Sequence, residues 1–175
     1  MNFRHTTSKY VLPLAVALLA ITAGPAGADE LDPKLTVTFI TDAAAGKAIR
    51  KKQYDLAVRK LEDANGRGIN DFYIANNLCV SYLKVGEADK ATEACDIAVA
   101  RIKDIVETSR NSSALTENHQ TMLAIALSNR GVVYIVNDMP ELARSDFKAA
   151  IDIRSGLAQP KINLARLAEI APATA

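Results

Sequence analysis

The chain has 175 residues, of which 49% are hydrophobic, 23% are charged and 5% are aromatic, with no tryptophan. This balance excludes a disordered or collagen-like chain. The formal net charge of +1 supplies no basic field that would attract nucleic acid. With so few aromatic residues, alanine, leucine, isoleucine and valine must fill the core, which favours closely packed helices and an all-α fold.

Residues 1–28 have the layout of a secretory signal peptide. A basic start is followed by an uncharged, apolar stretch over residues 11–23, and then by small residues at Ala26 and Ala28. We expect cleavage between Ala28 and Asp29, which would give an exported protein, periplasmic or secreted. The alternative is an uncleaved membrane anchor. The apolar stretch is short for a span of about 20 residues, so we expect no membrane insertion of the mature chain.

Helical periodicity dominates the rest of the chain, and an internal repeat accompanies it. Ala57, Ala91 and Ala143 each precede an apolar residue by four positions and another alanine by seven. The offsets between them are 34 residues (91 − 57) and 52 residues (143 − 91), so the second contains one unit plus an 18-residue insertion. Upstream of each alanine, a small residue and a second residue recur in register, namely Ala45 with Ala48, Cys79 with Tyr82, and Gly131 with Tyr134.

These units of small, aromatic and alanine positions resemble the tetratricopeptide repeat (TPR) family. The best match runs from Asn77 to Ala98, and the third unit matches nearly as well from Asn129 to Ala150. The first unit is degenerate and keeps Tyr54, Ala57, Leu61 and Ala64, and the family tryptophan is replaced by Thr41, Ala75 and Leu127. The resemblance implies an α-solenoid of three TPR-like antiparallel helix pairs plus a C-terminal capping helix, stabilised by stacking of the units.

The repeat alignment sets the expected boundaries along the chain. Helix pairs are expected over about 35–66, 71–106 and 115–155, with Asp138 capping a helix that has Pro140 in its first turn. A last helix over about 160–170 would cover the final unit with Ile162, Leu164, Ala165, Leu167 and Ala168. The segments are a signal peptide (1–28), a lead-in (29–37), a degenerate unit 1 (38–71), unit 2 (72–105), a polar insertion (106–123), unit 3 (124–157), and a capping helix with tail (158–175).

The insertion is polar around residues 107–113, whereas Ile105 and Val106 continue the apolar stripe before it. We therefore expect two long helices that meet at a loop near residues 110–113. The insertion is either a spacer or a protrusion that contacts a partner, and the sequence leaves both open.

No catalytic or cofactor motif is present. The chain contains no nucleophile elbow, zinc-protease motif, phosphate-binding loop or dinucleotide fingerprint. His119 is the only histidine after cleavage, and no residue is spaced to share a metal ion with it. We therefore expect a protein that is not an enzyme and that needs no cofactor or metal.

Cys79 and Cys95 are the only cysteines. In an exported chain a single pair suggests a disulfide, and their positions in the repeat place them on facing helices of one unit. The alternative is two small buried side chains that are not bonded to each other.

In the TPR family the first helix of each unit lines a concave groove, which suits an extended or helical peptide. Asn77 and Asn129 either bond the backbone of such a peptide or serve the repeat's own structure. We therefore expect a non-catalytic scaffold or adaptor that binds a protein or peptide of unknown identity in the groove. The alternative is a self-associating structural accessory of an envelope complex. The predicted groove consists of Tyr73, Asn76, Asn77, Val80, Leu83, Lys84, Ser128, Asn129, Val132, Ile135 and Val136, with a first wall of Phe39, Asp42 and Ile49.

Overall fold

The computed structural model describes residues 31–41, 43–68, 71–109 and 113–171, and only the backbone of residues 113–116. The expected signal peptide and its cleavage site, Asp42 of the groove wall and the C-terminal tail beyond 171 lie outside this description. The described part contains seven helices and no strand, which confirms the all-α prediction. The helices are α1 (Gly46–Arg50), α2 (Tyr54–Gly66), α3 (Phe72–Val85), α4 (Ala88–Thr108), α5 (Ser113–Val136), α6 (Pro140–Ile153) and α7 (Ala158–Ile170).

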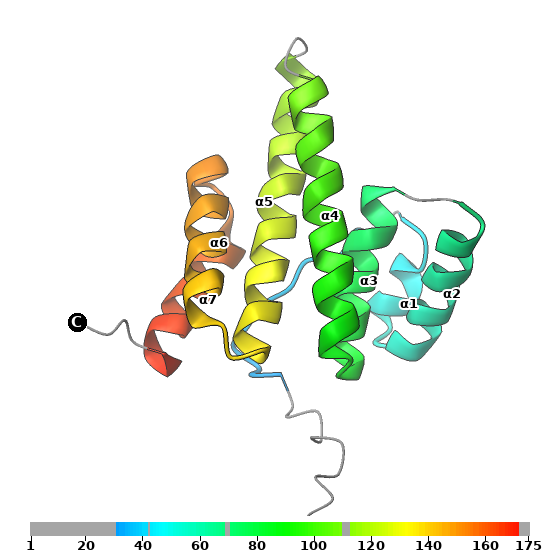
Figure 1. The fold of residues 1–175 in the computed structure, drawn as a ribbon, viewed down its shortest axis with the longest axis horizontal. Helices are drawn as coiled ribbons and strands as arrows, with labels where there is room; N and C mark the ends of the chain where they lie inside the picture. The colour runs from blue at the N-terminus through cyan, green and yellow to red at the C-terminus, as the bar shows by residue number, and fades with distance from the viewer. Residues whose placement is uncertain (1–30, 42, 69–70, 110–112, 172–175) are drawn as a thin grey trace, which may run out of the picture.

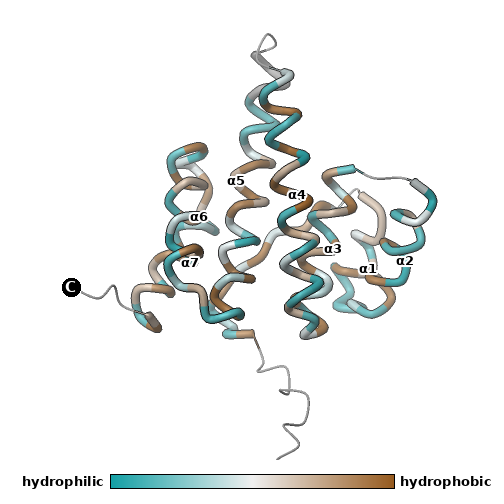
Figure 2. The backbone as a smooth tube through the Cα atoms, in the orientation of Figure 1, coloured by the Kyte–Doolittle hydropathy of each residue, from teal (hydrophilic) through white to brown (hydrophobic). Residues whose placement is uncertain are grey.

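The helices are arranged side by side, largely in chain order (Figure 1). Each helix packs against its neighbours in the sequence, and further contacts join α3 to α5 and α5 to α7. Hydrophobic positions recur at intervals along the helices with hydrophilic ones between them, as Figure 2 shows. That spacing gives each helix an apolar stripe for its neighbours.

Local signals explain where several helices begin and end. The Asp71 carboxylate accepts a hydrogen bond from the Ile74 main-chain N–H at 2.8 Å, which caps α3. The same helix ends at Gly86, whose φ of 83° suits a residue without a side chain. The prediction for Asp138 is wrong, because Met139 precedes α6 and Asp138 itself has a φ of 55°. Aspartate tolerates that left-handed conformation, so Asp138 is a turn residue and not a cap.

Small residues allow the helices of a pair to pack closely. Ala57, Ala91 and Ala143 are fully buried. A Cβ atom added to Gly131 of α5 would lie 2.5 Å from Cε1 of Phe147 on α6. The α5–α6 contact therefore depends on the absence of a side chain at position 131.

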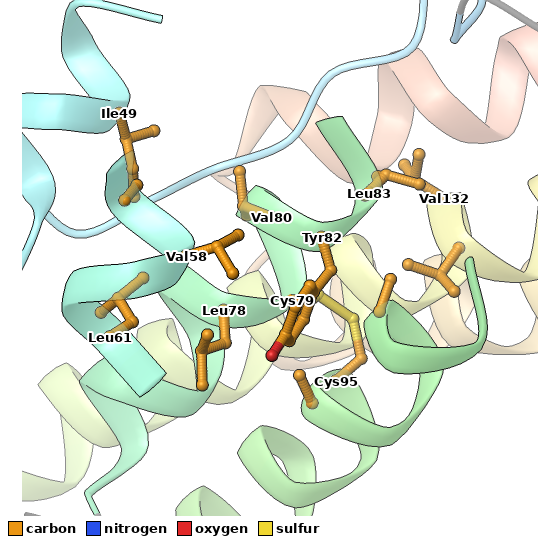
Figure 3. Close-up of a cluster of buried hydrophobic side chains, with 14 of the residues drawn as sticks. Ile49, Val58, Leu61, Leu78, Cys79, Val80, Tyr82, Leu83, Cys95 and Val132 are labelled. Carbon is orange, nitrogen blue, oxygen red and sulfur yellow. A yellow bond between two sulfur atoms is a disulfide. The ribbon is translucent and has the colours of Figure 1, made fainter. Parts of the chain in front are cut away.

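Cys79 of α3 and Cys95 of α4 are joined by a disulfide, with their Cα atoms 4.9 Å apart. Both residues are buried, and Tyr82 lies beside them in Figure 3. The Tyr82 hydroxyl donates to Glu62 of α2 at 2.7 Å, and burial is the main reason that its pKa is raised. This region therefore links three successive helices.

Arg130 of α5 connects this helix to α4 and α6. Its guanidinium donates two hydrogen bonds to Asp146 of α6, at 2.7 and 2.9 Å, and one to Asp96 of α4 at 2.9 Å. These carboxylates hold the pKa of Arg130 above its ordinary value, with the Asp146 hydrogen bonds as the largest cause. A guanidinium that bonds to two carboxylates fixes the relative positions of the helices and also stabilises the contact between them.

The first helix pair is much shorter than predicted. We expected a helix from about residue 35 or 38, but residues 31–40 form no helix and α1 has only five residues. Ala45, directly before α1, has a φ of 62°. Consequently Phe39 does not lie on a helical groove wall, whereas Ile49 lies on α1 and is buried.

The later helices follow the predicted layout more closely. Helix α4 continues to Thr108 and α5 begins at Ser113, so both extend into the predicted insertion and project beyond the other helices (Figure 1). The expected loop apex at 110–112 lies outside the described residues. No helix of the described segments combines the length and apolarity needed to cross a membrane.

Helix α7 covers the array with only part of the face predicted for it. Leu167 is fully buried and Leu164 packs against the same core. In contrast, Ile162 is 46% exposed, and Ala165 and Ala168 are exposed as well. The prediction therefore assigned too many residues of α7 to the face that covers the last unit.

Candidate binding face and the extended segment

A stretch of the chain's own N-terminal region, extended from Leu35 onward after a turn at residues 33–34, lies across the predicted groove. Residues 31–40 pass the helices in the order α7, α5 and α3, as the hydrogen bonds below establish. In Figure 1 this segment crosses the helices before it leads into α1. We call residues 31–40 the N-terminal segment.

The centre of the contact is Asn129 of α5. Its side-chain oxygen accepts the main-chain N–H of Thr38 at 2.8 Å, and its side-chain nitrogen donates to the carbonyl of the same residue at 2.7 Å. Asn76 of α3 donates to that carbonyl as well, at 3.2 Å, and accepts a bond from Asn129 at 2.9 Å. Both asparagines are buried, so Thr38 is held by a closed polar network.

The same arrangement recurs two residues away in each direction. Asn77 of α3 accepts the N–H of Ile40 at 2.8 Å and donates to its carbonyl at 3.0 Å. Asn163 of α7 accepts the N–H of Thr36 at 2.8 Å and donates to its carbonyl at 2.8 Å. We call Asn77, Asn129 and Asn163 the asparagine ladder.

A side-chain amide is suited to this task because it carries a donor and an acceptor together. Each ladder amide satisfies both main-chain polar groups of one residue, as the next strand of a sheet would. All three ladder residues are buried. Their unpaired amides would be costly there, so the segment and the ladder stabilise each other.

Charged residues anchor the start of the N-terminal segment to α7. Asp32 pairs with Arg166, which also donates to Glu169 at 2.6 Å. Lys34 lies 3.8 Å from the same glutamate. A hydrogen bond from the Lys34 main-chain N–H and the pairing with Arg166 lower the pKa of Asp32, and Arg166 chiefly lowers the pKa of Glu169.

Of the predicted groove residues, Asn76, Asn77 and Asn129 hydrogen-bond to the N-terminal segment. Val80, Leu83 and Val132 belong to the cluster that its apolar side chains contact. Lys84 is half-buried, and burial together with nearby Lys52 lowers its pKa. Ile135 is also partly buried, whereas Tyr73 is 37% and Val136 is 45% exposed. The remaining predicted residues are buried, namely Asn76, Asn77, Val80, Leu83, Ser128, Asn129 and Val132.

Asn163 is the important residue that the sequence-based prediction missed. It follows Asn129 by 34 residues (163 − 129), the offset found between the first two units. That spacing was sufficient to predict that Asn163 occupies the same position on α7 as Asn129 does on α5. The N-terminal segment was missed too, although Leu35, Val37 and Phe39 alternate with threonine or isoleucine, a period typical of extended chain.

The described residues contain no cluster of three or more histidine, cysteine, aspartate or glutamate side chains that could hold a metal ion. Nothing in the asparagine ladder resembles a catalytic group, because neutral amides neither exchange protons nor act as nucleophiles at ordinary pH. What this face does chemically is hold an extended backbone.

The chain was compared with protein-family models, with curated proteins and with solved structures. None of the three comparisons finds a match. The role of this face therefore follows from its own geometry.

Proposed function

We propose that this protein is an exported, non-catalytic scaffold of the TPR-like solenoid type, and that its asparagine-bearing face binds a segment of a partner protein. The observation that carries the proposal is the asparagine ladder. It holds the main chain of Thr36, Thr38 and Ile40 through paired hydrogen bonds. A face that accommodates one extended backbone in this way has the shape and polarity for recognising extended chain.

Main-chain recognition also explains the chemistry of the face. Main-chain groups are the same in every sequence, so hydrogen bonds to them give affinity for any extended peptide. Contacts with the side chains of the peptide give the specificity. Tyr73, Val136 and Ile170 supply exposed apolar surface on the helices that carry the ladder. Exposed apolar residues on a face with ordered polar contacts are typical of protein-binding surfaces.

Affinity capture from a cell-envelope extract with variants of exposed residues tests the proposal. Val136→Glu places a charge on the ladder face, and Ile97→Glu is the matched control on α4, where the side chain is 37% exposed. We expect the wild type and the Ile97 variant to recover the same partners and the Val136 variant to lose them. Buried Leu83 and Val132 are unsuitable, because a charge there would unfold the protein.

Recovery of identical partners by the Val136 and Ile97 variants would show that partners do not use this face. Circular dichroism of both variants establishes that each remains folded. A partner lost only from the Ile97 variant would assign binding to the opposite side of the array.

A second candidate function is self-association as a structural accessory. It is favoured by the outer face of α7, where Ile162 is 46% exposed beside the exposed Ala165. Light scattering over a range of concentrations tests it, with Ile162→Glu as the variant. A molar mass that stays monomeric and independent of concentration would eliminate this function.

A further inference from the structure

The N-terminal segment has two different edges. Thr36, Thr38 and Ile40 direct their main-chain groups to the asparagine ladder. Between them, the main-chain N–H and C=O groups of Val37 and Phe39 form no hydrogen bond within the described part of the chain. Alternate residues of an extended chain point their main-chain groups in opposite directions. The Val37 and Phe39 groups therefore point away from the ladder.

The side chains show how the segment is oriented on the helices. Leu35, Val37 and Phe39 pack against the core cluster that contains Val80. Ile40 packs against the other cluster, which contains Leu123. The two sets of side chains thus point to opposite flanks, and one main-chain edge faces the helices. The main-chain groups of Thr36, Thr38 and Ile40 therefore face the helices, and those of Val37 and Phe39 face outward.

The outward edge is fixed in place because the segment is part of the fold. Leu35 is only 5% exposed, and the segment's main chain is bonded at three consecutive alternate residues. Asp32 adds its ion pair with Arg166. A partner that displaced the segment would have to break these contacts together, whereas a partner that joined the outer edge would break none of them.

Apolar surface lies along the same helices. Val136 follows Asn129 by seven residues (136 − 129), and Ile170 follows Asn163 by seven (170 − 163), which is two helical turns in each case. Residues so spaced share a helix face. The two side chains are 45% and 43% exposed. Val132 and Leu167, which precede Val136 and Ile170 by about one helical turn, belong to the cluster that Leu35, Val37 and Phe39 contact. The two exposed side chains therefore lie toward that flank of the segment.

We propose that the outer edge of the N-terminal segment, at Val37 and Phe39, is a site of strand addition for an extended segment of a partner protein. The partner's main chain pairs with the free N–H and C=O groups, and its alternate apolar side chains rest on Val136 and Ile170. This inference deepens the proposed function, on which it rests, by naming how the partner is held. An extended segment with an unpaired main-chain edge and apolar surface nearby fits an extended partner better than a helix, whose main-chain groups are already paired within it.

The first test measures binding of a fluorescein-labelled peptide with the sequence of residues 34–41 to the mature protein. That peptide has an alternating pattern and can pair antiparallel with its own copy in the groove. The decisive comparison is Val37→Pro against Val37→Ala, because both lose the valine side chain and only proline lacks the N–H. We expect saturable one-to-one binding that is at least tenfold weaker for the proline variant. Equal affinities, or no binding by the wild type, would overturn strand addition.

A second test does not depend on any ligand. Thr38→Pro removes an N–H that faces Asn129, whereas Val37→Pro removes one that faces outward. Relative to the alanine variants at the same positions, we expect the Thr38 proline to lower the midpoint of thermal unfolding and the Val37 proline to leave it nearly unchanged. Equal losses at both positions would overturn the edge-on orientation and the proposal with it.

Two outcomes would identify a different occupant or a different mode. If peptide binding accelerates hydrogen exchange at Thr36, Thr38 and Ile40, the peptide displaces the segment, and strand addition is wrong although groove binding stands. If light scattering shows a dimer that Val37→Pro abolishes and Val37→Ala preserves, the occupant is a second copy and not a partner protein. If Val136→Glu loses the partners while Val37→Pro and Val37→Ala bind the peptide with equal affinity, the proposed function stands and strand addition is wrong.

Discussion

At the residue scale, the asparagine ladder depends on the particular chemistry of asparagine. Aspartate offers no donor to the carbonyl of Thr38, and leucine offers neither donor nor acceptor. Glutamine carries the same amide but is longer by one methylene, so its amide would be displaced from Thr38. Asn77, Asn129 and Asn163 are thus matched to a backbone at one fixed distance from the helices.

Truncation of a ladder residue should destabilise the fold measurably. Asn129→Ala removes the partner of the Thr38 N–H, one of the two donors to the Thr38 carbonyl, and the donor to the Asn76 side-chain oxygen. We expect the free energy of unfolding to fall by about 3 kcal/mol, the upper part of the range for unsatisfied buried groups. Urea denaturation measures it, and exposed Asn118→Ala of the same helix should change stability by less than about 0.5 kcal/mol. Similar values for both variants would mean that the ladder does not hold the segment.

At the element scale, adjacent helices are joined by close packing at small residues. Replacing a helical glycine by alanine ordinarily stabilises a helix by about 1 kcal/mol. At Gly131 the new Cβ would lie 2.5 Å from the ring of Phe147, which is fully buried and cannot turn away freely. The contact between α5 and α6 therefore decides the sign of the effect.

Gly131→Ala should lower the free energy of unfolding by about 1–3 kcal/mol, the usual cost of overpacking. Gly156→Ala is the control, because a Cβ atom there meets nothing within 4 Å. Chemical denaturation of the two variants gives the comparison. A stabilised Gly131 variant would show that α5 and α6 are farther apart than in this structure.

The disulfide between α3 and α4 is the second element-scale link. Its cysteines are 16 residues apart, and closing such a loop contributes about 3 kcal/mol in the chain-entropy account. Reductant should therefore lower the stability of the wild type by about that amount, and should not affect a Cys79→Ala/Cys95→Ala variant. Thiol titration of the unfolded, unreduced protein should find no free thiol. Two titratable thiols would show that the pair is not bonded.

The sequence predicted the helices whose positions depend on local patterns, and it did not predict the segment whose form depends on distant contacts. The repeat alignment, with Pro140 in the first turn of α6, predicted α3, α4 and α6 nearly where they occur. The local reasons for the two ends of α3 are the Asp71 cap and Gly86. Helix was expected from about residue 35 or 38, within the N-terminal segment, because the repeat alignment was extended over a degenerate unit. Its extended form depends on Asn163, which is 127 residues from Thr36 in the chain. No local pattern contains a contact of that range, and only the 34-residue spacing of the asparagines hinted at it.

At the scale of the whole molecule, the N-terminal segment ties the first described residues to the last helix. Asp32 pairs with Arg166, and Thr36 bonds to Asn163, both on α7. The segment continues past α5 to α3 before it enters α1. One extended stretch thus crosses three helices that are otherwise held mainly by their sequence neighbours.

The ion pairs at this junction predict a pH dependence with a definite sign. The pKa values of Asp32 and Glu169 are lowered in the folded protein. Their contribution to stability is therefore complete above the unfolded pKa values, about 4, and is lost as the pH falls through the lower folded values. We expect the thermal midpoint of the wild type to exceed that of Asp32→Asn at neutral pH, and the difference to shrink below about pH 4.

Exposed Asp104→Asn, near the C-terminal end of α4, is the matched control, since it should show no such pH-dependent difference from the wild type. A constant difference between the wild type and Asp32→Asn from pH 7 to pH 2 would mean that this carboxylate does not anchor the segment.

The contact between Thr36 and Asn163 also has a consequence for how the chain folds. Arrays of stacked units can nucleate anywhere and propagate between neighbours, because their contacts are local in sequence. Here the main-chain groups of Thr36 cannot complete their hydrogen bonds until Asn163, 127 residues later in the chain, has been made and α7 has formed. Such a contact raises the contact order, slows the final step, and makes the array fold and unfold as one cooperative body.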